Sequence, residues 1–400
     1  MASNPYLLYA LIIIYQYEPG NKLPQNSGAL FSRLVKALWK REREKPNTEL
    51  LSYSEVETYF ADLANYIFQQ DSLIVKCETA ISILNNDQNL LSAGKNANLL
   101  VVEDNTVRFK NRLIQDYFLA VTLNDEDLNS ILKNLNSILK NPTIFNGKRL
   151  REPWDYPIIA LSGLVNEPDE IIKQIAEKDP YLAAMCLDSG VKVNSDVLEF
   201  IVAKLVQTFD IAIKDNFEEI TQDEKIRETK KLLAQYYLNR LGTDTLPILG
   251  KVLIDPQKNA FIKRAIIDLL DMYNDTRIIH YLSEIVKDPS IEEKAIQLAN
   301  QQLMKLKTVI TASTVTGLAL AALTSNKTSK VLSKTQDAWD RVWGDKSQNS
   351  QLQLRVPAIY ALGRLKNKEA TLPLIDGLID VNNDVRQACL TSLKSSGWQP

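Results

Sequence analysis

The apolar residues of this chain recur at helical spacing over most of its length. In residues 31–39 they follow the i, i+3, i+4, i+7, i+8 pattern of a helix that buries one face. The members of this stripe are Phe31, Leu34, Val35, Leu38 and Trp39. A second helix is predicted from Ser52, which forms a capping-box pattern with Glu55 and precedes an apolar stripe that extends to Ile67. A shorter third helix is expected from about Glu78 to Leu84.

The pattern changes to strands near residue 100. LLVVE at Leu99–Glu103 and TVRF at Thr106–Phe109 flank the turn residues Asp104 and Asn105, which predicts a β-hairpin and the only strand pair of the chain. A closing helix is expected over about Arg112–Leu123. Three helices, a hairpin and a closing helix together predict a winged-helix arrangement.

The third helix of that arrangement would enter a DNA groove. It reads ETAISILNNDQNLL, which contains Glu78 and Asp87 but no lysine or arginine. Because neutralisation of phosphates needs clustered basic residues, this segment argues against a DNA-reading function.

Beyond Leu128 every segment is predicted to be helical, and one helix pattern repeats. The segments FIKRAIIDLL, LRVPAIYALG and VRQACLTSL can be superposed so that Lys263, Arg355 and Arg386 occupy one position. Lys294 follows Lys263 by the repeat interval of about 31 residues. Turn residues in LIDPQ, VKDPS and IDVNND separate the helices. Since a helix pair of this length cannot bury its apolar faces alone, neighbouring pairs must stack into a solenoid.

These patterns predict an all-α protein in which a winged-helix domain with one β-hairpin is followed by an α-α superhelix of the HEAT or armadillo type. The expected organisation is a helical segment and winged helix in residues 1–125, then linker helices and the first helical hairpins in 126–228. HEAT-type repeats follow in 229–304 and 351–400. An irregular insertion or connector in 305–350 interrupts the repeat phase.

Composition and net charge do not indicate which kind of partner the chain binds. The 47 basic and 49 acidic residues give a net charge of -2, so no global field attracts nucleic acid or anionic lipid. Cys77, Cys186 and Cys389 are too far apart to suggest a metal site or a disulfide framework, which fits a reducing cytoplasm. The apolar run Tyr6–Ile14 lacks the basic residues and cleavage site of a signal peptide. Threonine, serine and glycine dilute the uncharged stretch Thr308–Ser325, which disfavours a membrane span.

No catalytic constellation can be located. The Gly-Lys pairs at Gly94 and Gly147 lack the upstream glycine and the following hydroxyl residue of a phosphate loop, so ATP hydrolysis by this chain is not supported. The single histidine, His280, has no candidate catalytic partner and is interpreted as structural. The sequence therefore predicts a protein that is not an enzyme and that has no metal site or cofactor of its own.

Several longer motifs resemble one family. Residues 1 to about 190 resemble the part of NACHT-type STAND NTPases that follows the ATPase core. NPYLLYALIIIYQ and LPQNSGALFSRLVKALWKRE resemble the family's asparagine-proline helix and the start of its winged helix. VRFKNRLIQDYFLA resembles the signature of phenylalanine, basic residue and histidine, then glutamine, acid and aromatic residue. WDYPIIALSGLVNEPDEIIKQIAEKDPYLAAMCL resembles the linker helices that lead into a helical-repeat sensor, and the later repeats resemble short HEAT repeats.

The resemblance implies that ATP or ADP binds only where an ATPase core is present. Pro5 falls where the family's proline lies against adenine, and Asn111 falls where the family's histidine approaches the phosphates. Asn111 departs from the pattern, because asparagine can donate a hydrogen bond but cannot titrate. The ATPase core itself is absent ahead of Pro5. We therefore expect a fragment, an adaptor for a separate ATPase chain, or a reused remnant.

Three functions remain open at this stage. The resemblance favours a non-catalytic sensor or scaffold in bacterial signalling or antiviral defence, with repeats that bind a protein partner and not nucleic acid or a membrane. Short HEAT repeats also resemble those of phycobilin lyases, which handle a tetrapyrrole. A nucleic-acid-binding winged-helix protein is the third alternative, and a basic stripe on the folded surface would support it.

Overall fold

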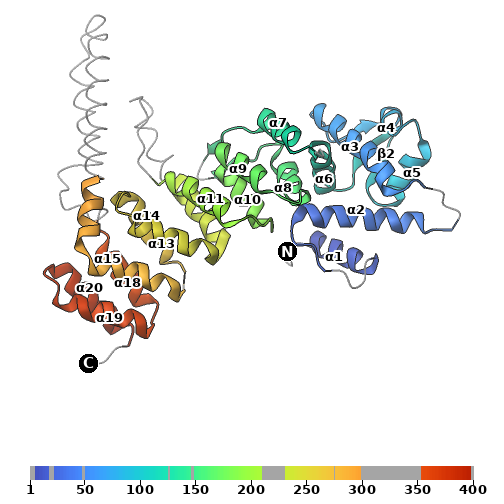
Figure 1. Ribbon diagram of the computed structural model, residues 1–400. Helices are drawn as coiled ribbons and strands as arrows, with labels where there is room; N and C mark the ends of the chain where they lie inside the picture. The colour runs from blue at the N-terminus through green and yellow to red at the C-terminus, as the bar shows by residue number, and fades with distance from the viewer. Residues whose placement is uncertain are drawn as a thin grey trace, which may run out of the picture. The chain divides into compact units, whose positions relative to one another are not determined.

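The computed structural model describes residues 5–17, 22–46, 50–124, 127–145, 148–209, 230–273, 275–298 and 353–397. In these residues the chain is mostly helical, as the sequence predicted (Figure 1). Contacts within the chain divide it into two compact units, which are described separately. Unit 1 comprises Met1–Pro142 and Leu150–Ile201, and unit 2 comprises Thr143–Arg149 and Val202–Pro400.

Unit 1 opens with three helices whose starts were visible in the sequence. They are α1 (Pro5–Tyr17), α2 (Ser27–Arg43) and α3 (Tyr53–Gln69). The side chain of Asn26 starts α2 by accepting a hydrogen bond from the backbone of Ala29 at 2.8 Å. The predicted capping box of α3 is present, because the Glu55 carboxylate accepts a hydrogen bond from the Ser52 N–H at 2.7 Å.

A small antiparallel sheet follows in unit 1, with strand order β1-β3-β2. Its strands are β1 (Val75–Lys76), β2 (Leu100–Glu103) and β3 (Thr106–Phe109). The predicted hairpin, β2–β3, is confirmed, and its turn residues Asp104 and Asn105 have the positive φ angles of a two-residue hairpin loop. The expectation of a single strand pair is wrong, because Val75 also pairs with Val107 of β3.

The third helix, expected over about Glu78–Leu84, is α4 (Cys77–Ile83), and the rest of the segment ETAISILNNDQNLL enters a separate helix, α5 (Gln88–Asn96). Asn85 and Asn86 separate the two with φ angles of 58° and 56°, a left-handed conformation that a helix cannot continue through. Asp87 then caps α5 by accepting a hydrogen bond from the N–H of Asn89 at 2.8 Å. The closing helix, α6 (Arg112–Leu123), has the predicted bounds.

Aromatic side chains of α2, α3 and α6 form the core of this part of unit 1. The Phe60 ring lies 5.6 Å from the rings of both Trp39 and Phe118, and Phe118 lies 5.6 Å from Phe109 of β3. Such offset and edge-to-face pairs add about 1 kcal/mol each to the burial of the rings themselves. The core therefore fixes α6 against both α3 and the sheet.

The remaining helices of unit 1 are α7 (Leu128–Ile138), α8 (Asp155–Leu164), α9 (Asp169–Lys178) and α10 (Pro180–Asp188), and α11 (Ser195–Gln207) spans the boundary with unit 2. Helices α2 and α8 approach closely because each contributes a glycine. A Cβ built on Gly28 would lie 2.2 Å from the carbonyl oxygen of Ala160, and one on Gly163 would lie 2.3 Å from Asn26 Oδ1. Any larger side chain would force the two helices apart.

The prediction that every segment beyond Leu128 is helical is wrong at one place. Strands β4 (Ile144–Phe145) and β5 (Lys148–Arg149), which belong to unit 2, pair antiparallel. Pro142 and Pro153 bracket this segment, and proline cannot supply the N–H that a helix interior needs.

In the described residues of unit 2, helices stack in two layers as three pairs (Figure 1). The helices are α13 (Leu246–Ile254), α14 (Ala260–Leu270), α15 (Ile279–Lys287), α18 (Arg355–Arg364), α19 (Lys368–Asp376) and α20 (Asn383–Ser395). One layer is α13, α15 and α19, and the other is α14, α18 and α20. Within the stack α13 pairs with α14, α15 with α18, and α19 with α20.

The three segments superposed in the sequence lie in α14, α18 and α20, which form one layer. A helix over residues 289–298 follows α15, and α18 packs on both α15 and α14. Lys294, which the sequence pattern equated with Lys263, is exposed, and Ala295 is the buried residue instead. The charged pair Glu293 and Lys294 faces solvent, so Lys294 shares the spacing of Lys263 but not its burial. The expected irregular region 305–350 and the stretch Thr308–Ser325 lie outside the described residues.

The three predicted turns between repeat helices share one hydrogen bond. The carboxylates of Asp255, Asp288 and Asp380 each accept from the backbone N–H two residues later, at 2.8, 2.9 and 2.8 Å. Aspartate closes such a turn because its short side chain mimics a backbone carbonyl. In the described part of the chain, no helix is long and apolar enough to cross a membrane.

Candidate functional site

The two residues singled out by the family resemblance lie at helix starts in unit 1. Pro5 is the first residue of α1, and its side chain lies outside the described part of the chain. Asn111 is the N-cap of α6, and its Oδ1 accepts a hydrogen bond from the Leu113 N–H at 2.8 Å. This contact accounts for Asn111 as a helix-capping residue.

The signature that follows Asn111 is buried almost completely. Gln115, Asp116, Tyr117 and Phe118 are at most 3% exposed. Phe118 joins the aromatic core described above, and Tyr117 donates a hydrogen bond to Glu57 Oε1 of α3 at 2.7 Å. These side chains hold α6 in place, and none of the four is available to a ligand at the surface.

Tyr117 belongs to a buried hydrogen-bonded group on α3 and α6. The hydroxyl groups of Tyr53 and Tyr117 lie 3.2 Å apart, and Tyr53 also donates to Glu57 Oε1 at 3.0 Å. Burial raises the pKa of both phenols above the usual value, and the neighbouring Glu57 carboxylate raises them further. Both phenols are therefore protonated donors at neutral pH, which suits them to stabilise the Glu57 carboxylate.

Asp116 is the centre of a second polar group in unit 1. Its Oδ1 accepts a hydrogen bond from Arg112 Nε at 3.0 Å, and its Oδ2 lies 3.6 Å from an Arg151 nitrogen. Arg151 also lies over the Tyr156 ring, with 3.9 Å between the guanidinium carbon and the ring centre. Burial raises the pKa of Asp116 to about 6, even though both arginines act to lower it.

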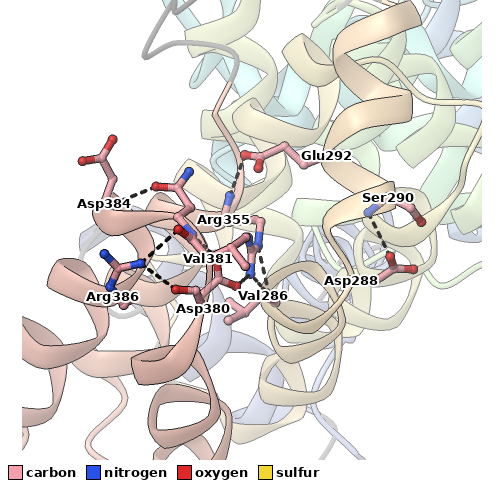
Figure 2. A network of polar contacts seen from close by, with 10 residues as sticks. Val286, Asp288, Ser290, Glu292, Arg355, Asp380, Val381, Asp384 and Arg386 are labelled. Atoms are coloured by element: carbon pink, nitrogen blue, oxygen red, sulfur yellow. Dashed lines mark hydrogen bonds and ion pairs between the residues drawn. The ribbon is translucent and has the colours of Figure 1, made fainter.

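Arg355 is the centre of a polar network in unit 2 that joins three elements (Figure 2). Its side chain is buried and donates to the backbone carbonyl of Val286, at the end of α15, from Nε at 3.0 Å and from a terminal nitrogen at 2.7 Å. The guanidinium also forms a bidentate pair with Asp380, in the turn between α19 and α20. Hydrogen bonds from Arg355 hold the pKa of Asp380 below its usual value.

Two further contacts extend the network. Glu292 Oε1 accepts from the backbone N–H groups of Leu354 and Arg355 at 2.6 and 3.1 Å, so a carboxylate caps the start of α18. Arg386 donates to the backbone carbonyls of Asp380 and Val381 at 2.7 and 2.9 Å (Figure 2). Arg386 thus holds the backbone of the turn that precedes α20, and Arg355 holds its Asp380 carboxylate.

Lys263 differs from the arginines that the sequence pattern placed in the same position. It is fully buried, and its ammonium nitrogen has no hydrogen-bond acceptor among the described residues. Burial lowers its pKa to about 8, against a smaller opposite effect of Asp255. The sequence pattern grouped Lys263 with the two arginines, and it gave no indication that Lys263 would lack an acceptor among the described residues.

Large apolar side chains are exposed beside the Arg355 network. Ile379 and Val381, on either side of Asp380, are 88% and 95% exposed, and Leu372 of α19 is 66% exposed. A turn whose backbone and Asp380 carboxylate are held by arginines while it presents apolar side chains to water is typical of a contact surface.

The described residues contain little chemistry for catalysis. Among them no group of three or more histidine, cysteine, aspartate or glutamate side chains could hold a metal ion. His280 is exposed at the start of α15, with the Tyr281 ring 5.3 Å away. Burial raises the pKa of Cys389 to about 11, so this thiol is protonated at neutral pH and is a poor nucleophile.

No family model matches this chain, and no curated protein is detectably similar to it. The site must therefore be judged from its own geometry. The sequence indicated the position of Arg355 through the repeat pattern and of Asp380 through the turn IDVNND. It gave no indication of Glu292, which acts across a long sequence separation, or of Arg151 as the partner of Asp116.

Proposed function

We propose that this protein is a non-catalytic binding protein whose helical stack in unit 2 contacts a protein partner. The observation that carries the proposal is the exposure of Ile379 and Val381 on a turn that Arg355 and Arg386 hold rigid. Apolar side chains on a pre-organised backbone bind with little loss of conformational entropy. The stacked pairs extend this surface in the manner of HEAT-type repeats.

The arrangement of unit 1 supports a winged-helix assignment within the same proposal. Helix α3, strand β1, helices α4 and α5 and the β2–β3 hairpin follow one another in the chain, and β3 lies between the other two strands. Lys95 is the only basic residue of α5, which disfavours binding of a DNA backbone. We infer that this unit docks on another part of a signalling assembly, as the resemblance to NACHT-type proteins implies.

We place this activity in a reducing compartment such as the cytoplasm. Cys77 and Cys389 carry free thiols, and Cys389 is buried. A secreted protein with buried thiols would more often pair them.

The test is quantitative capture of partners by the full chain in its native cells, after cross-linking. The informative variant is Ile379→Ser with Val381→Ser, and the control is Leu73→Ser with Ile74→Ser, which removes two exposed apolar side chains from unit 1. We expect one protein to be recovered with the wild type and the control, and to be depleted about tenfold or more with the first variant.

Equal recovery with both variants would contradict the proposed surface. Turnover of ATP by the isolated chain would contradict the non-catalytic assignment. Visible absorbance of the purified protein would instead support the tetrapyrrole-handling alternative, and salt-sensitive binding to DNA would support the nucleic-acid alternative.

A further inference from the structure

Asp116 connects two parts of unit 1 that are distant in sequence. Arg112, one turn earlier on α6, donates to one carboxylate oxygen, and Arg151 approaches the other from the segment that leads into α8. Arg151 is the second residue after the chain returns to unit 1 at Leu150. The ion pair with Asp116 therefore fastens the first residues of the returning segment to α6.

The hydrogen bonding of this carboxylate is incomplete. Asp116 is 2% exposed, and its Oδ2 has no hydrogen-bond donor among the described residues, since Arg151 is too distant and contributes only charge. The neighbouring Gln115 Nε2 is likewise buried without an acceptor in the described part of the chain. A buried carboxylate with an unsatisfied oxygen is costly to keep ionised.

Few charged groups act on Asp116. Among the described residues they are Arg112 on its own helix and Arg151 on the returning segment. The acidic residue that α3 directs toward α6, Glu57, faces the hydroxyl group of Tyr117 instead. The ionisation of Asp116 is therefore governed by burial and by these two arginines.

We propose that Asp116 is a pH-sensitive switch, which holds Arg151 and the adjoining residues 150–152 against α6 when ionised and releases them when it binds a proton. Protonation neutralises the carboxyl group and removes the attraction to Arg151. The Arg151 side chain is already 52% exposed, so it can turn into water at small cost. This switch is independent of the binding surface proposed for unit 2.

The pKa of Asp116 near 6 places the transition in a mildly acidic range. The test is hydrogen–deuterium exchange of the full chain at pH 7.5 and pH 5, corrected for the intrinsic effect of pH on exchange. We expect peptides that cover residues 150–156 to lose protection by about tenfold at the lower pH, while peptides of the aromatic core do not.

Three variants distinguish a switch from general loss of stability. Asp116→Asn should show low protection of residues 150–156 at both pH values, and Arg151→Met should do the same with the Asp116 carboxylate intact. Glu78→Gln, which removes an exposed carboxylate of unit 1, should respond to pH as the wild type does. Equal protection of the wild type at both pH values, or an unchanged pH response in Arg151→Met, would overturn the proposal.

Discussion

Glu292 Oε1 lies 2.6 Å from the backbone nitrogen of Leu354, although the two residues are 62 positions apart in the sequence. This contact connects the helix over residues 289–298 to the start of α18. It places the start of α18 beside the helix over residues 289–298, and α18 in turn packs on α15. The repeat is therefore continuous in space across an interruption in the sequence.

Arg355 should be the most sensitive side chain of unit 2. Replacement by methionine would leave Asp380 partly buried without its partner and two hydrogen bonds to Val286 unmade. We expect Arg355→Met to lower the free energy of unfolding by about 3–5 kcal/mol, as measured by urea denaturation with circular dichroism. Arg355→Lys should recover only part of this loss, because one ammonium group cannot form both sets of contacts.

Arg364 provides the matched control for that measurement. It pairs with Asp271 in the same unit, but its side chain is 61% exposed. Arg364→Met should therefore cost no more than about 1 kcal/mol. Similar losses for the Arg355 and Arg364 variants would show that the buried network has no special importance.

Lys263 should destabilise the protein at neutral pH. Its pKa is lowered in the folded state from 10.5 to about 8, so folding disfavours the charged form. We expect Lys263→Met, which keeps the volume and removes the charge, to raise the free energy of unfolding at pH 7 by about 1–3 kcal/mol.

The stability difference between Lys263→Met and the wild type should depend on pH. Below pH 8 the unfolded and folded states both carry the proton and the full penalty applies, whereas above pH 10.5 neither state carries it. The stability difference between Lys263→Met and the wild type should therefore shrink as the pH rises from 8 to 10.5. A difference that stays constant over this range would rule out the buried amine as its cause.

Gly28 should tolerate no side chain. A Cβ at this position would lie 2.2 Å from the Ala160 carbonyl oxygen, which is backbone and cannot rotate away. We expect Gly28→Ala to lower the midpoint of thermal unfolding, with a loss of about 1–3 kcal/mol. Gly242→Asn is the control, because no atom lies within 4 Å of a Cβ there and asparagine tolerates its φ of 78°. A smaller loss at Gly28 than at Gly242 would contradict the close helix contact.

The sequence was sufficient where local chemistry decides the structure. The cap at Ser52 and Glu55, the hairpin around Asp104 and the bounds of α6 follow from side chains within a few residues of each other. The segment ETAISILNNDQNLL was an exception, because the left-handed backbone of Asn85 and Asn86 ends α4 and a separate helix, α5, follows.

The sequence was insufficient where packing between distant segments decides. Repeat spacing grouped Lys294 with Lys263 and Arg355, but Lys294 is exposed whereas the other two are buried. The approach of Arg151 to Asp116 and of Glu292 to Leu354 depends on tertiary contacts that no local pattern encodes. The spacing of apolar residues identifies the buried face of a helix, but it does not identify the residues of another segment that this face will contact.

The most direct test of the two-layer stack is a deletion of residues 299–352, with an eight-residue Gly-Ser linker in their place. From Glu292 to Leu298 the helix rises by about 9 Å, a span that such a linker covers. If α15 pairs with α18 as described, hydrogen exchange should show α18 and α20 as protected in the deletion variant as in the wild type. Loss of protection in α18 and α20, with α13 and α14 unchanged, would contradict the stack.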